Sequence, residues 1–400
     1  MRLAAPGTPH LTYCTNIHPG ESWGEIRGNL ERFVVAVKAR VSPDAPFGVG
    51  LRLGDAAARE LDDPAALDAL CAFLDAHGLY VFTINGFPYG PFHGTPVKER
   101  VYLPDWLDPE RVAYSDRLAR ILTRLLPDEP GLEGSVSTVP GAFRTSVRAE
   151  ADLATMARHL AIHVATLHRL REATGRTITL ALEPEPACIF ETTAEAVAFF
   201  EERLLAPSLR AEMARFVCVA ASSVETVLRR HIGLCIDVCH AAVEFEEPAE
   251  VVALAAHAGV RIAKMQLGAG LRIPRLDAPA RAALAAFAEG VYLHQVVERR
   301  DGTLARWTDL PDALAGVDPD AEREWRVHFH VPVFQRDLGA FENTQAVLAD
   351  FLALVAAEPV TQHLEVETYT WDVLPPALRT TDVVTGIARE LAWVTERLPR

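Results

Sequence analysis

The sequence predicts a (β/α)₈ TIM barrel, an α/β fold in which eight parallel strands are each followed by helical chain. Short β-branched runs alternate along the chain with longer runs rich in alanine and leucine, the order of a parallel sheet covered by helices. Polar residues gather at the carboxyl ends of several strand-like runs, where barrel active sites form. No composition shift, charge run or low-complexity linker divides the 400 residues, so we expect a single barrel domain over residues 1–400.

Nine runs are typical of strands, one more than the barrel needs. They cover residues 11–16, 47–53, 79–86, 134–140, 177–186, 232–240, 261–268, 325–334 and 363–371. We expect the surplus strand in an elaborated connection at about 269–335, between strands seven and eight. Within it, residues 291–307 are predicted to form a hairpin, because Asp301-Gly302 is a favoured turn dipeptide. The run at 325–334 either pairs with this hairpin or serves as a barrel strand.

Composition excludes several classes of function. The formal net charge of −15 disfavours binding to nucleic acid or to an anionic membrane surface. No stretch approaches the roughly 20 apolar residues that cross a bilayer, and the start lacks the pattern of a secretory signal. Six cysteines in so long a chain favour a reducing cytoplasm over a disulfide framework. We therefore expect a cytoplasmic protein whose partner is a small-molecule metabolite, as a monomer or a homodimer.

Four strands carry bulky apolar residues on one face and small or polar residues on the other. Since residues two apart on a strand share a face, Glu183, Asp237, Gln266 and Glu367 all point away from the helices, toward one mouth of the barrel. Three carboxylates do not all stay ionised in a poorly solvated site without a cation. The pattern indicates a bound divalent metal, although a single acid at a strand end is more commonly a helix cap.

With these residues in place, the chain resembles the xylose isomerase-like TIM-barrel superfamily of sugar isomerases and epimerases. The resemblance lies in "LEPEP", "DVCH", "KMQLG" and "VETYTW". It implies metal ligands at Glu183, Asp237 and Glu367, with Glu365 as the alternative acid on strand eight, and it adds His240 through the Asp-x-x-His pattern. Gln266 stands where the superfamily usually has histidine. His328 and His330 are candidates to compensate, since endonuclease IV-like members carry an extra ligand pair after strand seven.

A narrower resemblance spans most of the chain. The segments "NGFPYGPFHG", "VKERVYLPDW", "STVPG", "LEPEP", "YLHQVVER", "HFHVPVF" and "HLEVETYTW" together resemble the EboE family, which is called a metabolite traffic protein. This resemblance implies a cytoplasmic barrel that handles a small, prenylated or sugar-like precursor, and leaves the chemistry open.

Further candidates for substrate binding lie in loops and strands near the predicted mouth. The loop at 83–106 is dense in glycine, proline and aromatic residues, and loops at this end of a barrel carry function. The alternative is a rigid loop whose aromatic residues only pack it down. The candidate substrate-binding residues are Asn16, His18, Asn85, Tyr89, His93, Lys98, Lys264 and His328.

The leading hypothesis is a metal-dependent isomerase or epimerase acting on a small hydroxy-carbonyl compound. Glu183, Asp237, Gln266, Glu367 and His330 would hold Mn²⁺, Mg²⁺ or Zn²⁺. Glu183 and Glu367 would exchange the proton, and His240 would hydrogen-bond a substrate oxygen. Two alternatives stay open: a non-catalytic metabolite-binding or traffic protein, and a zinc phosphodiesterase like the repair endonucleases, which the acidic charge disfavours.

Overall fold

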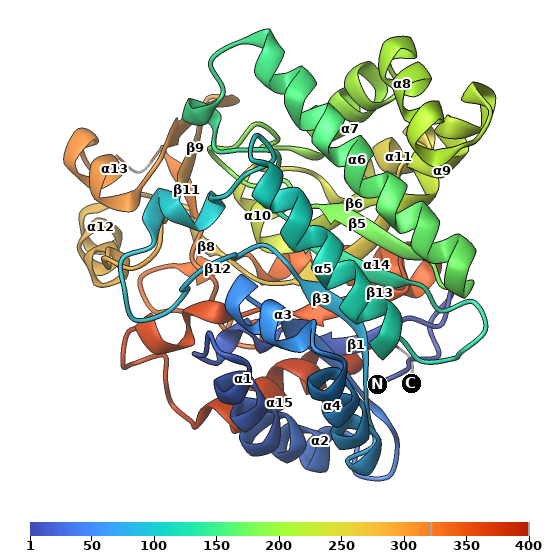
Figure 1. Ribbon diagram of the computed structural model, residues 1–400. Coiled ribbons are helices and arrows are strands. Elements are labelled where there is room, and N and C mark those ends of the chain that lie inside the picture. Colours follow the sequence, from blue (N-terminus) through green and yellow to red (C-terminus); the bar gives the residue numbers. More distant parts are fainter. Residues whose placement is uncertain (321, 399–400) are drawn as a thin grey trace.

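Eight parallel strands form the central sheet of the protein. We describe them from a computed structural model, in which residues 1–320 and 322–398 are described (Figure 1). The barrel strands are β1 (His10–Tyr13), β2 (Phe47–Arg52), β3 (Leu79–Asn85), β4 (Gly134–Thr138), β5 (Ile178–Leu182), β6 (Ile232–Asp237), β7 (Arg261–Leu267) and β13 (His363–Val366). Their spatial order, β1-β13-β7-β6-β5-β4-β3-β2, is sequential around the barrel. The predicted (β/α)₈ fold is therefore confirmed.

The barrel closes between β1 and β2 largely through one side chain. Thr12 donates its hydroxyl hydrogen to the Gly48 carbonyl at 2.7 Å and accepts the Gly50 N–H at 3.0 Å. A parallel bridge between Cys14 and Gly50 adds the next contact. Gly50 must lack a side chain, because a Cβ there would lie 1.9 Å from Glu365 Oε1 inside the barrel. The closure thus leaves room for a carboxylate at the barrel axis.

Helices cover the outside of the barrel (Figure 1). Capping side chains start several of them; for example, Ser22 and Glu25 form a capping box, and Asp108 accepts the Glu110 N–H. The helices are α1 (Trp23–Asn29), α2 (Val35–Val41), α3 (Asp55–Leu61), α4 (Pro64–Ala76), α5 (Pro109–Leu125), α6 (Glu150–Thr174), α7 (Thr193–Phe199), α8 (Pro207–Val217), α9 (Ala221–His231), α10 (Val238–Val243), α11 (Pro248–Ala258), α12 (Ala278–Leu284), α13 (Leu310–Gly316), α14 (Gln345–Ala357) and α15 (Val383–Thr395). Among the described residues, no helix combines the length and the apolar character that spanning a bilayer requires.

The connection between β7 and β13 folds into a second, antiparallel sheet. Its strands are β8 (Leu271–Ile273), β9 (Val296–Arg300), β10 (Thr303–Trp307), β11 (Glu324–Val327) and β12 (Glu342–Asn343), in the order β10-β9-β11-β8-β12. The predicted hairpin is confirmed as β9 and β10, and its turn residues Asp301 and Gly302 both have positive φ, 51° and 75°. Figure 1 shows this sheet with α12 and α13 at one side of the barrel.

The surplus run at 325–334 belongs to this second sheet. Its first residues form β11, which pairs with β8 and with β9 of the hairpin. Of the two alternatives that the sequence left open, pairing with the hairpin is therefore the one observed. The strand ends at Val327, earlier than predicted, because the backbone turns sharply there. The Phe329 N–H donates to the Val327 carbonyl, and Pro332 has no N–H to continue a ladder. This bend carries His328 and His330 out of the sheet and over the barrel.

Candidate metal centre

Three acidic side chains meet at the carboxyl end of the barrel. Glu183 follows β5, Asp237 is the last residue of β6, and Glu367 follows β13. All three are buried, and one carboxylate oxygen from each lies within 4.8 Å of the others. The structure therefore brings together three of the four residues that the strand pattern placed at one mouth.

Two asparagines hold Glu367 in place. The side-chain nitrogens of Asn16 and Asn85 donate to Glu367 Oε1 at 2.6 and 3.1 Å. Asn85 is itself oriented by the Phe87 N–H, which donates to its Oδ1 at 3.1 Å. Since Asn85 ends β3 and Asn16 lies just after β1, the barrel geometry sets both donors.

Asp237 caps one helix and also faces the site. Its Oδ1 accepts the N–H groups of Cys239 and His240, at 2.6 and 3.3 Å, at the start of α10. Its Oδ2 is buried and has no hydrogen-bond partner among the described residues, and the same holds for Glu183 Oε2. A buried carboxylate oxygen without a partner is costly, so these two atoms are where a cation fits.

Three imidazoles lie beside Asp237, and their hydrogen bonds fix their tautomers. Nδ1 of His240 lies 2.9 Å from the Pro184 carbonyl, and Nδ1 of His330 lies 2.9 Å from the Glu367 carbonyl. Because a carbonyl only accepts, Nδ1 carries the hydrogen in both rings. Nδ1 of His328 lies 2.7 Å from Gln295 Oε1, and the amide nitrogen of Gln295 donates to the Pro186 carbonyl, so His328 has the same tautomer. In the neutral rings, each Nε2 therefore carries a lone pair. The Tyr369 hydroxyl lies 3.4 Å from Nε2 of His328 and can donate to that one.

These lone pairs converge. Nε2 of His328 lies 3.1 Å from Nε2 of His240 and 3.3 Å from Nε2 of His330. Two imidazole nitrogens bound to one tetrahedral Zn²⁺ at ~2.0–2.1 Å lie about 3.3–3.4 Å apart, so the spacing fits a shared cation. Asp237 Oδ2 is 3.9 Å from the Nε2 atoms of both His240 and His330. Asp237 thus stands between an imidazole group and a carboxylate group.

Burial and mutual repulsion set the protonation of the acids. Burial, followed by the nearby Asp237 carboxylate, raises the pKa of Glu183 well above its ordinary value. Burial and Glu183 do the same to the pKa of Glu367. Burial also raises the pKa of Glu185 to about 8, and it lowers the pKa of His328 well below its ordinary range. Burial alone would raise the pKa of Asp237, but the neighbouring His240 and His330 hold it below its ordinary value. Glu183 and Glu367 are therefore the groups whose protons a bound cation would displace.

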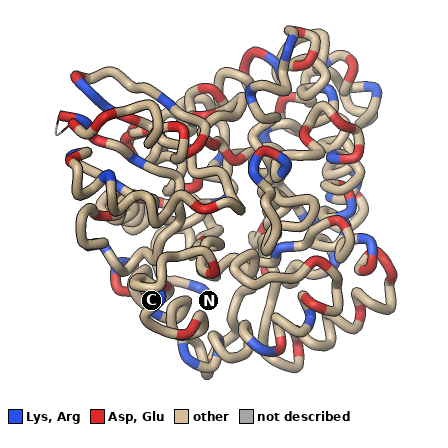
Figure 2. Tube along the Cα trace, turned by 90° about the vertical axis from the view of Figure 1, so that its left-hand side faces the viewer, with Lys and Arg blue, Asp and Glu red and all other residues tan. Residues whose placement is uncertain are grey.

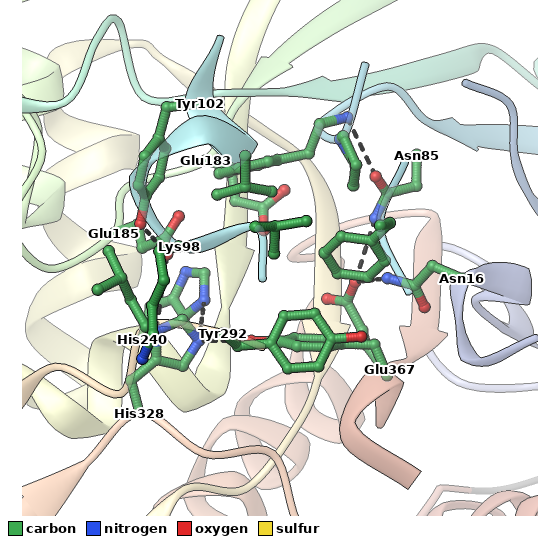
Figure 3. A pocket seen from close by; sticks show the side chains of 17 residues that line it. Asn16, Asn85, Lys98, Tyr102, Glu183, Glu185, His240, Tyr292, His328 and Glu367 are labelled. Atoms are coloured by element: carbon green, nitrogen blue, oxygen red, sulfur yellow. Dashed lines mark hydrogen bonds and ion pairs between the residues drawn. The ribbon is translucent and has the colours of Figure 1, made fainter. Parts of the chain in front are cut away.

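A cavity opens above these groups, and Figure 3 shows its lining. The cavity volume is about 50 Å³. One water needs roughly 10–15 Å³ on this measure, so there is room for a small ligand. The floor is polar and the roof is apolar. The lining residues are Asn16, Asn85, Phe87, Pro88, Phe92, Val97, Lys98, Val101, Tyr102, Glu183, Glu185, His240, Tyr292, Leu293, His328, Glu367 and Tyr369.

The other predicted site residues lie around this cavity or away from it. Asp237, Gln266 and His330 are buried beyond its lining. Gln266 Oε1 accepts the thiol of Cys235 at 3.0 Å, while its Nε2 has no partner among the described residues. One layer down the barrel, the ammonium of Lys264 pairs with Glu365 at 2.6 Å, which leaves Glu367 as the strand-eight acid that faces the site.

Three candidates for substrate binding pack elsewhere in the loops. His18 stacks on Phe33 with ring centroids 4.3 Å apart. The hydroxyl of Tyr89 donates to Glu110 at 3.0 Å. His93 is buried beside Phe92, and neither of its ring nitrogens has a partner among the described residues.

Sequence reasoning missed Glu185, Tyr102 and Gln295. The Tyr102 hydroxyl donates to Glu185 Oε1 at 2.7 Å, and the Gln295 amide nitrogen lies 3.0 Å from that hydroxyl. A signal for Glu185 was present, because it lies two residues after Glu183 on the same strand face. Tyr102 and Gln295 lie in long connections, and no periodic pattern in the sequence predicts where these connections lie over the barrel.

The fold and these side chains define a (β/α)₈ barrel with a candidate metal centre at its carboxyl end. No protein-family model and no curated protein matches the sequence. Among solved structures, the chain is similar to a D-tagatose 3-epimerase-like protein, with a TM-score of 0.48 and 11% identity over 97% of this chain and 96% of that one. It is similar to the IolI protein with a binding zinc atom (0.47, 12%, 97% of each chain). It is also similar to a xylose isomerase domain protein from Alicyclobacillus acidocaldarius subsp. acidocaldarius (0.44, 11%, 97% and 98%).

Proposed function

We propose that this protein is a divalent-metal-dependent enzyme of the isomerase or epimerase type that acts on a small hydroxy-carbonyl metabolite. The observation that carries the proposal is Asp237 Oδ2, a buried oxygen without a partner among the described residues. It lies between the carboxylates of Glu183 and Glu367 and the Nε2 atoms of His240 and His330. Oxygen-rich ligands suit Mn²⁺ or Mg²⁺, and imidazole nitrogens suit Zn²⁺.

The chain's own groups suit this chemistry. Bound there, a divalent ion would polarise a carbonyl or hydroxyl oxygen of the substrate. Glu183 and Glu367 line the cavity from different strands, so each can hold or give up a proton on a different side of a small ligand. Asn16 and Asn85 orient Glu367, and His240 offers Nε2 at the cavity wall. Gln266 and His330 complete the proposed metal shell.

The resemblance to the EboE family suggests a second candidate, a metabolite-binding or traffic protein without turnover. Gln266 favours it, because an amide in place of histidine on strand seven weakens a metal shell. All six cysteines are free, which supports the proposed cytoplasmic location. Tight retention of a metabolite through purification, without conversion of candidate sugars, would favour this function.

The imidazole group of His240, His328 and His330 supports a third candidate, a zinc phosphodiesterase. The net charge of −15 argues against a nucleic-acid substrate. In the view of Figure 2, basic and acidic residues are interspersed along the chain. Failure to cleave abasic duplex DNA with Zn²⁺ present would remove this candidate.

Elemental analysis tests the metal centre directly. We expect wild-type protein to retain close to one equivalent of Mn, Zn or Fe, or to bind Mg²⁺ on addition, and Asp237→Asn and Glu183→Gln to lose it. Asp55→Asn is the matched control, since Asp55 is also buried but pairs with Arg117 at 2.7 Å on the outside of the barrel. Folded Asp237→Asn protein with wild-type metal content would contradict the proposal.

A further inference from the structure

The cavity has two chemically different halves. Its floor carries the acids and imidazoles described above. Its roof is apolar and comes from three connections that are distant in sequence: the loop after β3, the insertion after β7, and the segment after β13. Phe92, Val97 and Tyr292 form a small hydrophobic cluster that is separate from the main core, with Tyr369 packed against it.

Three aromatic rings form the centre of this roof. The ring centroids of Phe92, Tyr292 and Tyr369 lie 5.0–5.2 Å apart in all three pairs. The interplanar angles are 52°, 53° and 75°, and all three residues line the cavity. Aromatic pairs at such distances attract beyond simple area burial. Rings of this kind favour an aromatic or unsaturated hydrocarbon group as the fourth member of the cluster.

Backbone contacts hold the roof over the site. The N–H groups of Val97 and Lys98 both donate to the Val291 carbonyl, at 2.8 and 3.1 Å. The Lys98 ammonium then bonds Asp309 Oδ2 at 2.6 Å, which ties the loop after β3 to the insertion. These bonds hold the apolar residues of the roof opposite the acids of the floor.

The charges of the cavity disfavour a phosphate ester. All of its lining residues are described, and they include one lysine and no arginine. That lysine, Lys98, is already neutralised by Asp309. Glu183, Glu185 and Glu367 face the same space. A phosphate dianion would find no unpaired Lys or Arg in the lining to replace its hydration, whereas a neutral ligand needs none.

We infer that the cavity takes a neutral hydroxy-carbonyl compound bearing an aromatic or unsaturated hydrocarbon group, rather than a sugar phosphate. The oxygens would lie toward Glu183 and Glu367, and the hydrocarbon group would pack against Phe92, Tyr292 and Tyr369. This inference rests on the proposed function for the oxygen end of the ligand. The preference for the hydrocarbon end rests on the roof alone.

Three probes that share one hydroxy-ketone head test the inference. They are 2-hydroxyacetophenone, hydroxyacetone and dihydroxyacetone phosphate, which differ in carrying a phenyl group, a methyl group or a phosphate ester. Calorimetric titration of metal-loaded wild-type protein should show 2-hydroxyacetophenone binding at least about tenfold more tightly than either other probe. Equal or tighter binding of the phosphate ester overturns the inference, as does the absence of saturable binding of the phenyl compound.

Two roof variants locate the preference. Phe92→Leu and Tyr292→Leu should each weaken binding of 2-hydroxyacetophenone about tenfold and change binding of hydroxyacetone less than about twofold. Phe216→Leu is the matched control, because Phe216 is 38% exposed on α8. Equal weakening of both probes contradicts the assignment of the phenyl group to the roof. Melting curves identify any variant that misfolds. The same loss of phenyl binding in both roof variants would show that the effect does not come from misfolding of one of them.

Repeating the titrations on chelated protein separates the two proposals. If the protein binds no metal but still prefers the phenyl compound, and Phe92→Leu removes that preference, the roof assignment stands and the proposed metal function fails. If metal binds but the phenyl preference is absent, the proposed function stands and this inference fails.

Discussion

Replacing Glu183 by glutamine should stabilise the metal-free protein while it removes metal binding. Glu183 Oε2 is buried without a hydrogen-bond partner among the described residues, so glutamine loses no partner at that atom. One of its oxygens lies within 4.8 Å of an Asp237 oxygen. Two unit charges at 4.8 Å repel by about 3.5 kcal/mol at an effective dielectric constant of about 20. Protonation of Glu183 already relieves part of this repulsion, so we expect a net gain of roughly 1–3 kcal/mol at pH 8.

Calorimetric melting with and without metal measures this effect. For a chain of this length, 1 kcal/mol shifts the melting temperature by about 1.2 °C, so Glu183→Gln should melt about 1–4 °C above wild type in chelator. Saturating metal, at about a thousand times its Kd, should add about 4 kcal/mol to wild type and far less to the variant. The order of the two melting temperatures therefore reverses on adding metal.

A buried glutamate with a cation partner gives the opposite result and serves as control. Glu298 is buried, pairs with Arg323 at 2.8 Å and accepts the Trp325 indole N–H at 2.8 Å. Glu298→Gln should therefore lower the melting temperature equally with and without metal. A Glu183→Gln variant that melts below wild type in chelator and still gains full stability from metal would refute the reasoning.

Three further predictions concern protons and supporting residues. Metal affinity should rise with pH, because the raised pKa values of Glu183 and Glu367 mean that a cation displaces protons; titrations in two buffers of different ionisation enthalpy will show proton release. Asn16→Leu should weaken metal binding about tenfold without unfolding the barrel, since it removes the shorter of the two hydrogen bonds that hold Glu367 Oε1; competition with a chromophoric chelator measures this. Burial raises the pKa of Glu390 to about 7, so its folded form holds a proton that the unfolded chain releases. Stability is therefore fully present below about pH 4.5 and is lost as pH rises through about 7. Between pH 5.5 and 8 this loss is about 2 kcal/mol, and Glu390→Gln should remove it in urea unfolding at these two pH values.

The sequence predicted the barrel and its acids because both follow from local periodicity. Alternation within a strand sets which face a residue takes, and parallel strands bring their carboxyl ends to one edge. That reasoning placed Glu183, Asp237 and Glu367 together. The sequence left open whether the run at 325–334 pairs with the hairpin or forms a barrel strand, and the structure shows the first. Its end at Val327 depends on a backbone turn that the hydrophobic pattern does not predict.

The parts that sequence did not predict depend on contacts between distant connections. Strand β12 has two residues, and β8 has three, too few to show a period. Gln295 orients His328 from 33 residues away, and Tyr102 reaches Glu185 across 83 residues. Such contacts depend on how the whole chain folds, so the pattern of residues within single strands does not predict them.

The barrel axis itself shows why the acids at its mouth indicate a cation from outside the chain. One layer below the site, Glu365 is fully buried, and the fold pairs it with Lys264 at 2.6 Å. At the mouth, three carboxylates stand within 4.8 Å of one another, and none of them forms an ion pair with a described lysine or arginine. A stability requirement alone would favour a second lysine there, or apolar residues. Groups that cost stability and stay unpaired beside a cavity are typical of functional sites, which supports the proposed divalent cation at this position.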